Sequence, residues 1–285
     1  MVKIRLARHI GFCSGVRRAI AIAEKTLAQK KGKVYSLGAI IHNPEVIRSL
    51  EKKGLITVRS LNEVEPWSTL ILPSHGSPRS VREAGKRKKL TLVDVTCPYV
   101  ASVQKICRTL FEKGEKVVIV GDRDHPEIRA LKDLAPSAMV IESAAQVAEN
   151  AFAHCKAGFI SQTTQSREKF FSVVSRILEK NHSGCEFHIY NTICLDTSKR
   201  QEEVKQLAGE VDVLLVIGSR TSANTKRLLR LGRKVNKRTF LAENEGHVRP
   251  AHIARARTIG IITGASAPNW LVTSVVKRIK EMKSA

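Results

Sequence analysis

The sequence predicts an α/β protein made of three similar domains around a metal or cluster site that three related segments build. The first observation is that Cys13, Cys97 and Cys194 each stand where an apolar run ends and a helical pattern begins. The second is that similar elements follow each cysteine in the same order. The third is that 285 residues allow large cores, and no linker-like stretch interrupts the alternation of strand and helix patterns.

Each cysteine lies in a frame that reads strand, cysteine, helix. The frames are VKIRLARHIGFCSGVRRAIAIAE at 2–24, LTLVDVTCPYVASVQKICRTL at 90–110 and FHIYNTICLDTSKRQEEVKQL at 187–207. Their repetition predicts three domains with boundaries close to the second and third cysteines, at 1–96, 97–192 and 193–285.

Two further strand patterns follow each cysteine and end in polar residues. The earlier pattern ends 28 or 29 residues after the cysteine, within 33–45, 116–127 and 213–225, and the later one lies within 68–76, 157–165 and 256–268. Ligands of open α/β sheets collect at the carboxyl ends of the strands, so we expect these polar residues to converge. In chain order they are His42, His75, His125, Glu127, Thr163, Ser222, Asn224 and Ser266.

The cysteine pattern favours a cluster over disulfides. The N-terminus lacks the apolar segment of a signal peptide and no run of 18 apolar residues occurs, so we expect a cytoplasmic protein whose thiols stay reduced. Three repeat-related thiolates leave one position of a four-coordinate iron–sulfur centre open for substrate. Taken singly, each of these cysteines also fits a small buried hydrophobe. The cysteines without a counterpart, which we expect to be packing residues, are Cys107, Cys155 and Cys185.

The polar residues indicate an anionic ligand. Histidine, serine and asparagine side chains beside the glycine-rich turns SHGS and TGAS offer the donors that hold phosphates. Glu127 is the one carboxylate of the set, and in an anion-binding pocket it would keep a proton and act as a donor, with His125 and Thr163 as relays. An equally good explanation of Glu127 is a first-turn helix residue after Pro126.

The chain is strongly basic. It has 49 Lys and Arg against 26 Asp and Glu, a net charge of +23, and the basic residues crowd into 77–89 and 225–238, which we expect to be exposed helix faces and flanking loops. This charge indicates an acidic partner, although a solvated surface explains it equally well. Nucleic-acid binding is disfavoured as the main function, because the sequence has no helix-turn-helix, zinc-finger, KH or RNP signature and few aromatic residues for stacking.

The motifs together resemble the 4-hydroxy-3-methylbut-2-enyl diphosphate reductase family over essentially the whole chain. The resemblance is carried by GFCSGV at 11–16, IHN at 41–43, SHG at 74–76, TCP at 96–98, HPE at 125–127, QTT at 162–164, IC and KRQ around 194–201, SANT at 222–225 and GASAP at 264–268. So many short matches in one order are very specific.

The resemblance implies a trefoil of three α/β domains with pseudo-threefold symmetry around a central, oxygen-sensitive [4Fe–4S] cluster. Its ligands match Cys13, Cys97 and Cys194. The diphosphate-binding positions match His42, His75, Ser222, Asn224 and Ser266. Glu127 matches the proton donor, with His125 and Thr163 beside it at the allylic end of the substrate.

The implied reaction is the reductive dehydroxylation of 4-hydroxy-3-methylbut-2-enyl diphosphate to isopentenyl and dimethylallyl diphosphate in the non-mevalonate pathway. It consumes two electrons and two protons, and the positive charge of the chain suggests an acidic electron donor such as a ferredoxin or flavodoxin. The alternative function is a basic nucleic-acid- or ribosome-binding protein that keeps the fold without turnover.

Three features depart from the family pattern. Asp196 stands where the family usually has a small residue, and its charge would either lower the potential of the cluster or point away. Ala223 replaces a common serine, which would remove one hydrogen bond to the diphosphate. The chain also ends soon after its last predicted helix, without the tail that some relatives fold over the site.

Overall fold

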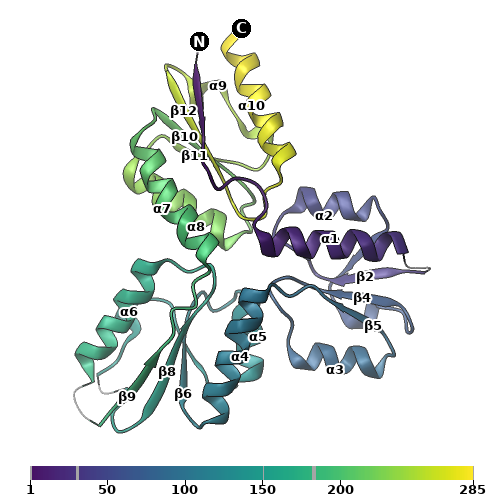
Figure 1. Cartoon of the computed structure of the whole chain (residues 1–285), viewed down its shortest axis with the longest axis vertical. Coiled ribbons are helices and arrows are strands. Elements are labelled where there is room, and N and C mark those ends of the chain that lie inside the picture. The colour runs from purple at the N-terminus through teal and green to yellow at the C-terminus, as the bar shows by residue number, and fades with distance from the viewer. Residues whose placement is uncertain (1, 30–31, 150, 182–183, 285) are drawn as a thin grey trace. The chain divides into compact units, whose positions relative to one another are not determined.

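The computed structural model describes residues 2–29, 32–149, 151–181 and 184–284 and confirms the α/β class. In the described residues the strands form three four-stranded sheets in which every pairing is parallel (Figure 1). The chain divides into two compact units. Unit 1 consists of Met1–Arg17, Ile41–Ser49 and Leu195–Ala285, and unit 2 of Arg18–Ile40 and Leu50–Cys194.

Unit 2 carries two sheets with the same strand order. The first has the order β3-β2-β4-β5 and the second β7-β6-β8-β9, so in each the earliest strand lies between the second and the third, and the fourth forms an edge. The strands are β2 (Val34–Leu37), β3 (Leu55–Val58), β4 (Thr69–Leu72), β5 (Thr91–Asp94), β6 (Lys116–Val120), β7 (Met139–Ile141), β8 (Lys156–Ser161) and β9 (Glu186–Ile189).

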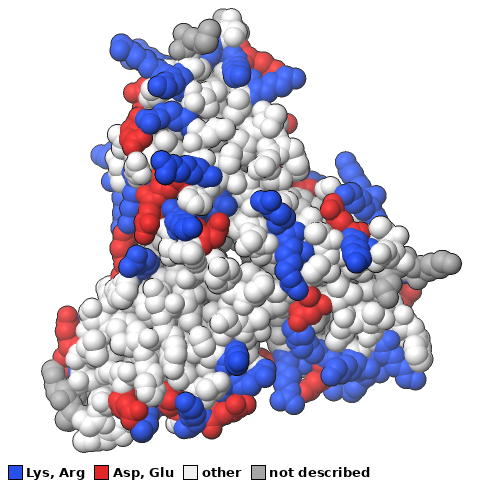
Figure 2. All heavy atoms as spheres, viewed as in Figure 1, with Lys and Arg blue, Asp and Glu red and all other residues white. Residues whose placement is uncertain are grey.

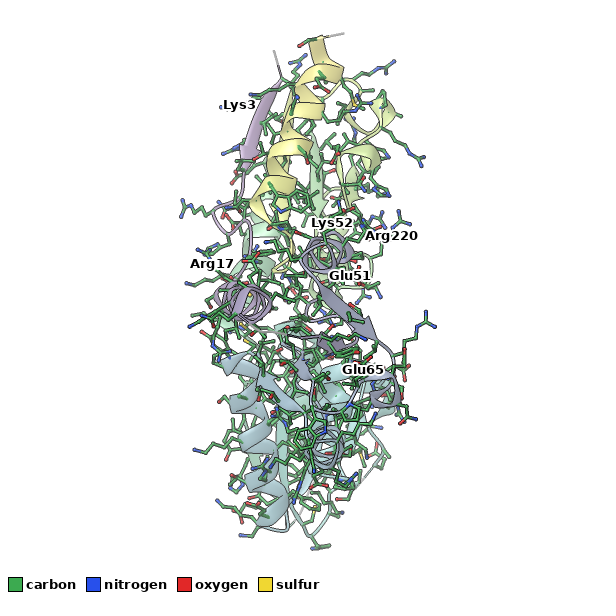
Figure 3. The ribbon with its side chains drawn as sticks, turned by 90° about the vertical axis from the view of Figure 1, so that its right-hand side faces the viewer. Lys3, Arg17, Glu51, Lys52, Glu65 and Arg220 are labelled. Atoms are coloured by element: carbon green, nitrogen blue, oxygen red, sulfur yellow. The ribbon has the colours of Figure 1, made fainter. Side chains whose placement is uncertain are left out.

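Unit 1 carries the third sheet, in which the start of the chain supplies the last strand. Its order is β1-β12-β10-β11, made of β1 (Lys3–Leu6), β10 (Val213–Ile217), β11 (Thr239–Ala242) and β12 (Thr258–Thr263). β1, whose first residue Lys3 is labelled in Figure 3, pairs with β12 as β5 pairs with β4 and β9 with β8. The three sheets therefore share one topology, and each edge strand leads to one of the cysteines Cys13, Cys97 and Cys194.

The predicted boundaries of the three domains stay a prediction. They keep β5 and β9 with the sheets that these strands join. β1, however, belongs to the sheet of the last segment, although the boundaries place residues 3–6 in the first. The arrangement of the three sheets around one centre likewise stays a prediction.

The helices repeat with the strands. A helix follows each cysteine and each first and third strand, and a short 3₁₀ turn follows each second strand. The helices are α1 (Ser14–Gln29), α2 (Pro44–Glu51), α3 (Arg79–Arg87), α4 (Pro98–Glu112), α5 (Pro126–Leu134), α6 (Arg167–Lys180), α7 (Leu195–Gly209), α8 (Ala223–Val235), α9 (Pro250–Ile253) and α10 (Asn269–Ser284), and the 3₁₀ turns are Leu61–Glu63, Ala144–Gln146 and Glu245–His247. Proline opens α4 and α5 because its fixed φ suits the first helical position.

Central strands are apolar on both faces because helices cover both faces of the sheet. In β10, Val213, Leu215 and Ile217 pack in one cluster with α10, whereas Leu214 and Val216 pack in another with α7 and α8. Figure 1 shows these helices on opposite faces of the sheet. In unit 2, alternate residues of β6 likewise pack against α6 on one face and against α4 and α5 on the other. Continuous apolar runs are typical of such doubly covered parallel strands.

The basic segments are largely exposed helix faces, as predicted. On α3 and the residues after it, Arg79, Lys86, Arg87 and Lys89 are exposed, and Figure 2 shows blue side chains gathered over that helix. On α8 the exception is Arg227, which is 5% exposed. In the part of the chain that the structure describes, no helix is long and apolar enough to cross a bilayer.

Candidate functional site

The three cysteines occupy equivalent places in the hydrogen-bond network. The N–H of Cys13 donates to the carbonyl oxygen of Ala265 (3.1 Å), that of Cys97 to Ser74 (2.9 Å), and that of Cys194 to Thr163 (2.9 Å). Each acceptor lies two residues after the third strand of the sheet concerned, β12, β4 or β8. The loop that bears each cysteine is therefore fixed to the carboxyl end of its own sheet, where ligands of parallel sheets bind.

The loops after the first strands are equivalent in a second way, because their polar residues cap the helices that follow. Asn43 Oδ1 accepts from the N–H groups of Glu45 and Val46 at the start of α2, and Ser222 Oγ accepts from Thr225 N–H at the start of α8. His125 Nδ1 accepts from Glu127 N–H at the start of α5, so the proton of a neutral His125 ring is on Nε2.

In unit 1 the structure brings the loops of His42 and Ser266 together. Ser266 Oγ donates to the carbonyl oxygen of His42 (3.1 Å), and Asn43 Nδ2 donates to the carbonyl oxygen of Ser266 (2.8 Å). Asn43 is 3% exposed and Ser266 6%. Asn43 thus joins two predicted diphosphate-binding loops, and the backbone of Ser266 adjoins Ala265, the acceptor of Cys13 N–H.

Asn224 is a buried side-chain amide at the start of α8. It is 3% exposed, and neither Oδ1 nor Nδ2 has a partner in the described chain. Buried polar groups are nearly always satisfied, so an orphaned amide at a helix N-terminus indicates a polar ligand. The adjacent Thr225 hydroxyl also has no partner within the described residues. It packs so closely that a Cβ on Gly264 would lie 2.2 Å from it and one on Gly218 2.6 Å.

The electrostatics of this part of unit 1 suit an anion. Burial and, to a lesser extent, the nearby charge of Lys226 hold the pKa of His42 below its ordinary value of 6.5. The ring is therefore neutral near pH 7 and can hold an anionic oxygen as a hydrogen-bond donor. Lys226, which is exposed in the first turn of α8, supplies a positive charge beside it.

In unit 2 the carboxylate of Glu127 is clamped by Thr163. Oε1 accepts from Thr163 N–H and Oε2 from Thr163 Oγ1, both at 2.7 Å, and the glutamate is 1% exposed. Glu127 does lie in the first turn of α5, but its burial excludes a role limited to a solvated charge at the helix end. Because Thr163 also accepts from Cys194 N–H, one residue connects the proposed proton donor with a predicted cluster ligand.

The loop of His75 is fixed from both neighbouring strands. Ser74 N–H and Oγ donate to the carbonyl oxygen of Ile40, at 3.0 and 2.9 Å, and the carbonyl oxygen of Ser74 accepts from Cys97 N–H. Gly76, with φ +85°, packs so tightly that a Cβ would meet Gln104 Nε2 at 2.3 Å. His75 therefore lies between two anchored residues, directly beside the loop of Cys97.

The donor set suits an iron–sulfur cluster, since Cys13, Cys97 and Cys194 are partly exposed cysteines at the strand ends. Within residues 2–29, 32–149, 151–181 and 184–284, no three His, Cys, Asp or Glu side chains are placed to hold a metal ion. Cys13 belongs to unit 1 and the other two to unit 2, so the convergence of the three stays a prediction.

Of the remaining cysteines, Cys107 lies in a core cluster and Cys155 packs against another. Burial raises the pKa of Cys107 to about 12, and its side chain lies in the core between α4 and α5. Cys155 and Cys185 are partly exposed, and both thiols donate to the carbonyl oxygen of Phe152 at 3.0 Å.

Two residues of this region were not predicted from the sequence. Asn43 lies in the motif IHN, of which only His42 is predicted to bind the diphosphate, although the pattern Asn-Pro-Glu is itself a helix-capping signal. Arg200, part of the motif KRQ, is 2% exposed and binds both oxygens of Asp196. A buried arginine cannot be told from a surface arginine by local sequence.

Comparison with known proteins gives one consistent result. A family model described as LytB protein matches residues 4–280. A 4-hydroxy-3-methylbut-2-enyl diphosphate reductase of Geobacter metallireducens is 40% identical over 284 residues, covering 100% of this chain and 99% of its own length. The protein of the same name from Aquifex aeolicus is 39% identical, covering 99% of this chain and 97% of its own.

Two solved structures match over nearly the whole chain. One, described as (E)-4-hydroxy-3-methyl-but-2-enyl diphosphate reductase, the terminal enzyme of the non-mevalonate pathway, is 37% identical with a TM-score of 0.70 and covers 99% of this chain and 100% of its own. The other is the E-1-hydroxy-2-methyl-but-2-enyl-4-diphosphate reductase of Plasmodium falciparum, which is 27% identical with a TM-score of 0.89 and covers 97% of this chain and 87% of its own.

Proposed function

The chain belongs to the LytB protein family, and from this membership and the site geometry we propose how it works as a 4-hydroxy-3-methylbut-2-enyl diphosphate reductase. The relatives bear the name of the enzyme, which favours an oxidoreductase of the non-mevalonate pathway over a nucleic-acid- or ribosome-binding protein without turnover. The substrate is an allylic diphosphate.

The proposed cofactor is a [4Fe–4S] cluster held by Cys13, Cys97 and Cys194. Support comes from three partly exposed cysteines whose backbone N–H groups make the same hydrogen bond in each of three sheets of one topology. When bound, the cluster supplies electrons and a Lewis-acidic iron for the hydroxyl oxygen of the substrate.

The residues of unit 1 bind the diphosphate in this proposal. The Asn224 amide, which has no hydrogen-bond partner among the described residues, takes the phosphate oxygens, together with Ser222 and the N-terminus of α8. Neutral His42 and Ser266 approach from the two loops that Asn43 joins, and His75 completes the set from the loop of Cys97. Ala223 offers no hydroxyl at the start of α8, so this helix gives one hydrogen bond fewer.

Glu127 donates the proton that the leaving hydroxyl needs. Thr163 fixes both carboxyl oxygens, so the orientation of the acid is set before substrate binds. His125, whose Nδ1 is engaged at the start of α5, can exchange a proton through Nε2. The single observation that carries this assignment is that Thr163 is hydrogen-bonded both to Glu127 and to the N–H of Cys194. It thereby joins a buried acid to one of the three cysteines that the sequence repeat marks as cluster ligands.

The electron donor is proposed to be an acidic protein such as a ferredoxin or flavodoxin, in a cytoplasmic location where thiols stay reduced. The net charge of +23 and the exposed basic faces of α3 and α8 support this partner.

Anaerobic purification and assay test the function. The protein should be brown, contain iron and sulfide, and convert the allylic diphosphate to the two isomeric products with a chemical reductant. A colourless protein that binds RNA tightly and shows no turnover would instead support the alternative.

A further inference from the structure

Arg200 is buried among the loops of unit 1 and uses its whole guanidinium group. It lies in the second turn of α7, the helix that begins directly after Cys194. Six hydrogen bonds of 2.7–3.4 Å engage its three nitrogens, enough for all five N–H donors of the group. The acceptors are the carbonyl oxygens of His9, Gly11 and Thr263, the hydroxyl of Thr263 and both carboxyl oxygens of Asp196.

These acceptors belong to segments far apart in sequence. His9 and Gly11 lie in the loop that leads from β1 to Cys13. Thr263 ends β12, two residues before Ala265, whose carbonyl oxygen accepts from Cys13 N–H. A single side chain thus ties α7 to the loop of a predicted cluster ligand and to the loop of Ser266, a predicted diphosphate-binding residue.

The loop before Cys13 has little freedom to adopt another path. Gly11 has φ +76° and its N–H donates to the Thr263 hydroxyl at 2.9 Å, the same oxygen that accepts from Arg200. A Cβ at Gly11 would lie 2.0 Å from Asn269 Oδ1, so the backbone is packed against the start of α10. At the other end of the loop, His9 N–H and Nδ1 contact Glu203 of α7 at 3.0 and 2.9 Å.

Asp196 balances the charge of Arg200. Its Oδ2 accepts from Nε at 2.8 Å and its Oδ1 from Nη2 at 3.4 Å. A buried guanidinium without a counter-ion would be strongly unfavourable, so the unusual aspartate two residues after Cys194 has a defined partner within its own helix. Its carboxylate is directed at Arg200, so of the two alternatives for Asp196 given above, its charge points away to a partner of its own.

We propose that Arg200, balanced by Asp196, is a positioning residue that fixes the sulfur of Cys13 relative to the loop of Ser266. The proposal rests on the proposed function, because it takes Cys13 as a cluster ligand. Removing the guanidinium group would leave the buried carbonyl oxygens of Gly11 and Thr263 and the partly buried one of His9 without this donor, and would release the loop before Cys13. The environment of the cluster and its retention should then both change.

The test is Arg200→Lys in the full-length holoenzyme, purified anaerobically. Lysine keeps the charge but has a point-like ammonium with three donors, which cannot span the three segments. The readouts are the rate of iron release to a chelator and the electron paramagnetic resonance spectrum of the reduced cluster. We expect iron release roughly 10–100-fold faster, as for other losses of groups that orient metal ligands, together with an altered spectrum. Arg230→Lys on the exposed face of α8 is the matched control.

Two further variants separate the possible causes. Thr263→Val removes only the shared hydroxyl acceptor and should change both readouts in the same direction but less, so the idea stays testable if Arg200→Lys does not fold. Arg200→Met with Asp196→Leu removes both charges and should not restore the wild-type rate. Restoration would show that only charge balance matters, and wild-type readouts in Arg200→Lys and Thr263→Val would overturn the proposal. Wild-type protein that takes up no cluster would instead refute the proposed function.

A separate observation concerns two cysteines outside the predicted site, Cys155 and Cys185. They immediately precede β8 and β9, whose register pairs Lys156 with Glu186, and Glu186 N–H donates to the carbonyl oxygen of Cys155 at 3.1 Å. Neighbouring strands lie about 4.8 Å apart, within the roughly 4.4–6.8 Å between Cα atoms that a disulfide spans. Both thiols are directed at one acceptor, the carbonyl oxygen of Phe152.

We infer that Cys155 and Cys185 form a dithiol that closes to a disulfide by exchange with a small disulfide such as oxidised glutathione. One thiolate attacks the glutathione disulfide and releases one glutathione thiol, and the second thiolate then displaces the other. Two protein thiols are oxidised and one disulfide is reduced to two thiols. The bond would join the amino ends of β8 and β9, whereas Thr163 and Cys194 lie beyond their carboxyl ends.

Anaerobic incubation of the holoenzyme with oxidised glutathione, followed by alkylation, digestion and mass spectrometry, tests this inference. We expect a linked peptide pair containing Cys155 and Cys185, and a glutathione adduct on Cys185 in the Cys155→Ser variant. Cys107, which is 0% exposed, should carry no adduct and serves as the internal control. Adducts on both residues without a linked pair, or no reaction at either, would overturn it.

Discussion

Replacing Glu127 by Gln tests the proton donor with the smallest possible change in shape. The carboxyl oxygens accept from Thr163 N–H and Thr163 Oγ1, both at 2.7 Å. Glutamine keeps a carbonyl oxygen for the N–H and presents its NH₂ to the hydroxyl, which can turn to accept. Both contacts survive, but the side chain no longer has a proton to transfer.

The expected losses of stability and of turnover differ in size. A hydrogen bond to a charged group contributes about 1.5–3 kcal/mol and a neutral one about 0.5–1.5. Compared end for end, these ranges put the loss of charge at about 1–1.5 kcal/mol per bond, or about 2–3 kcal/mol for the two bonds, of a typical stability of about 5–15 kcal/mol. Loss of a general acid lowers turnover roughly 10²–10⁴-fold, which is about 3–5 kcal/mol in the barrier. The variant should thus stay folded and lose turnover.

The assay measures anaerobic turnover with a chemical reductant at saturating substrate, with iron content and substrate binding measured on the same samples. The chain offers a matched control in Glu45→Gln, because Glu45 is the second residue of α2 as Glu127 is the second residue of α5. Glu45 pairs instead with Arg48 at 2.5 Å. Its variant should keep turnover within a few-fold of wild type.

Two results would refute the reasoning about Glu127. Normal turnover of Glu127→Gln would show that the proton comes from another group. Loss of substrate binding together with turnover would make Glu127 a binding or structural residue.

Three further predictions concern the cluster, the pH dependence and the charge. Serine variants of the three repeat-related cysteines should lose iron and sulfide, whereas those of the other three should keep them, and a fully loaded, active Cys97→Ser protein would contradict the ligand assignment. His42 has a pKa below 6.5 in the folded state, so the unfolded chain binds more protons below that pH, and the free energy of unfolding should fall as pH decreases from about 7 to about 5. His42→Asn should flatten this dependence in chemical denaturation, and an unchanged slope would exclude the histidine as its cause. Turnover driven by an acidic protein donor should drop steeply as salt shortens the Debye length from about 30 Å at 0.01 M to about 8 Å at 0.15 M. Turnover with a small neutral reductant should change little over the same range. A parallel fall of the two rates would show that the basic surface has no docking role.

Local signals were sufficient for the secondary structure and the repeat. Apolar runs such as VVIV at 117–120 and LLVI at 214–217 form central strands, because covered parallel strands need apolar residues on both faces. Pro98 and Pro126 mark the first residues of α4 and α5, since proline suits that position. The placement of each cysteine between a strand and a helix follows from the same signals.

The sequence by itself determined the class of fold, the threefold repeat and the family, because strand, helix and cap signals act over a few residues and the motifs are short and ordered. Only the tertiary structure decided which distant segments meet. β1 joins β12 although about 250 residues separate them, and Thr163 rather than another polar residue clamps Glu127. The local sequence around Arg200 is that of a surface arginine, yet the side chain is buried where carbonyl oxygens of two distant segments need donors. Such partners are fixed by the requirement to pair every buried polar group, which depends on the packed chain as a whole.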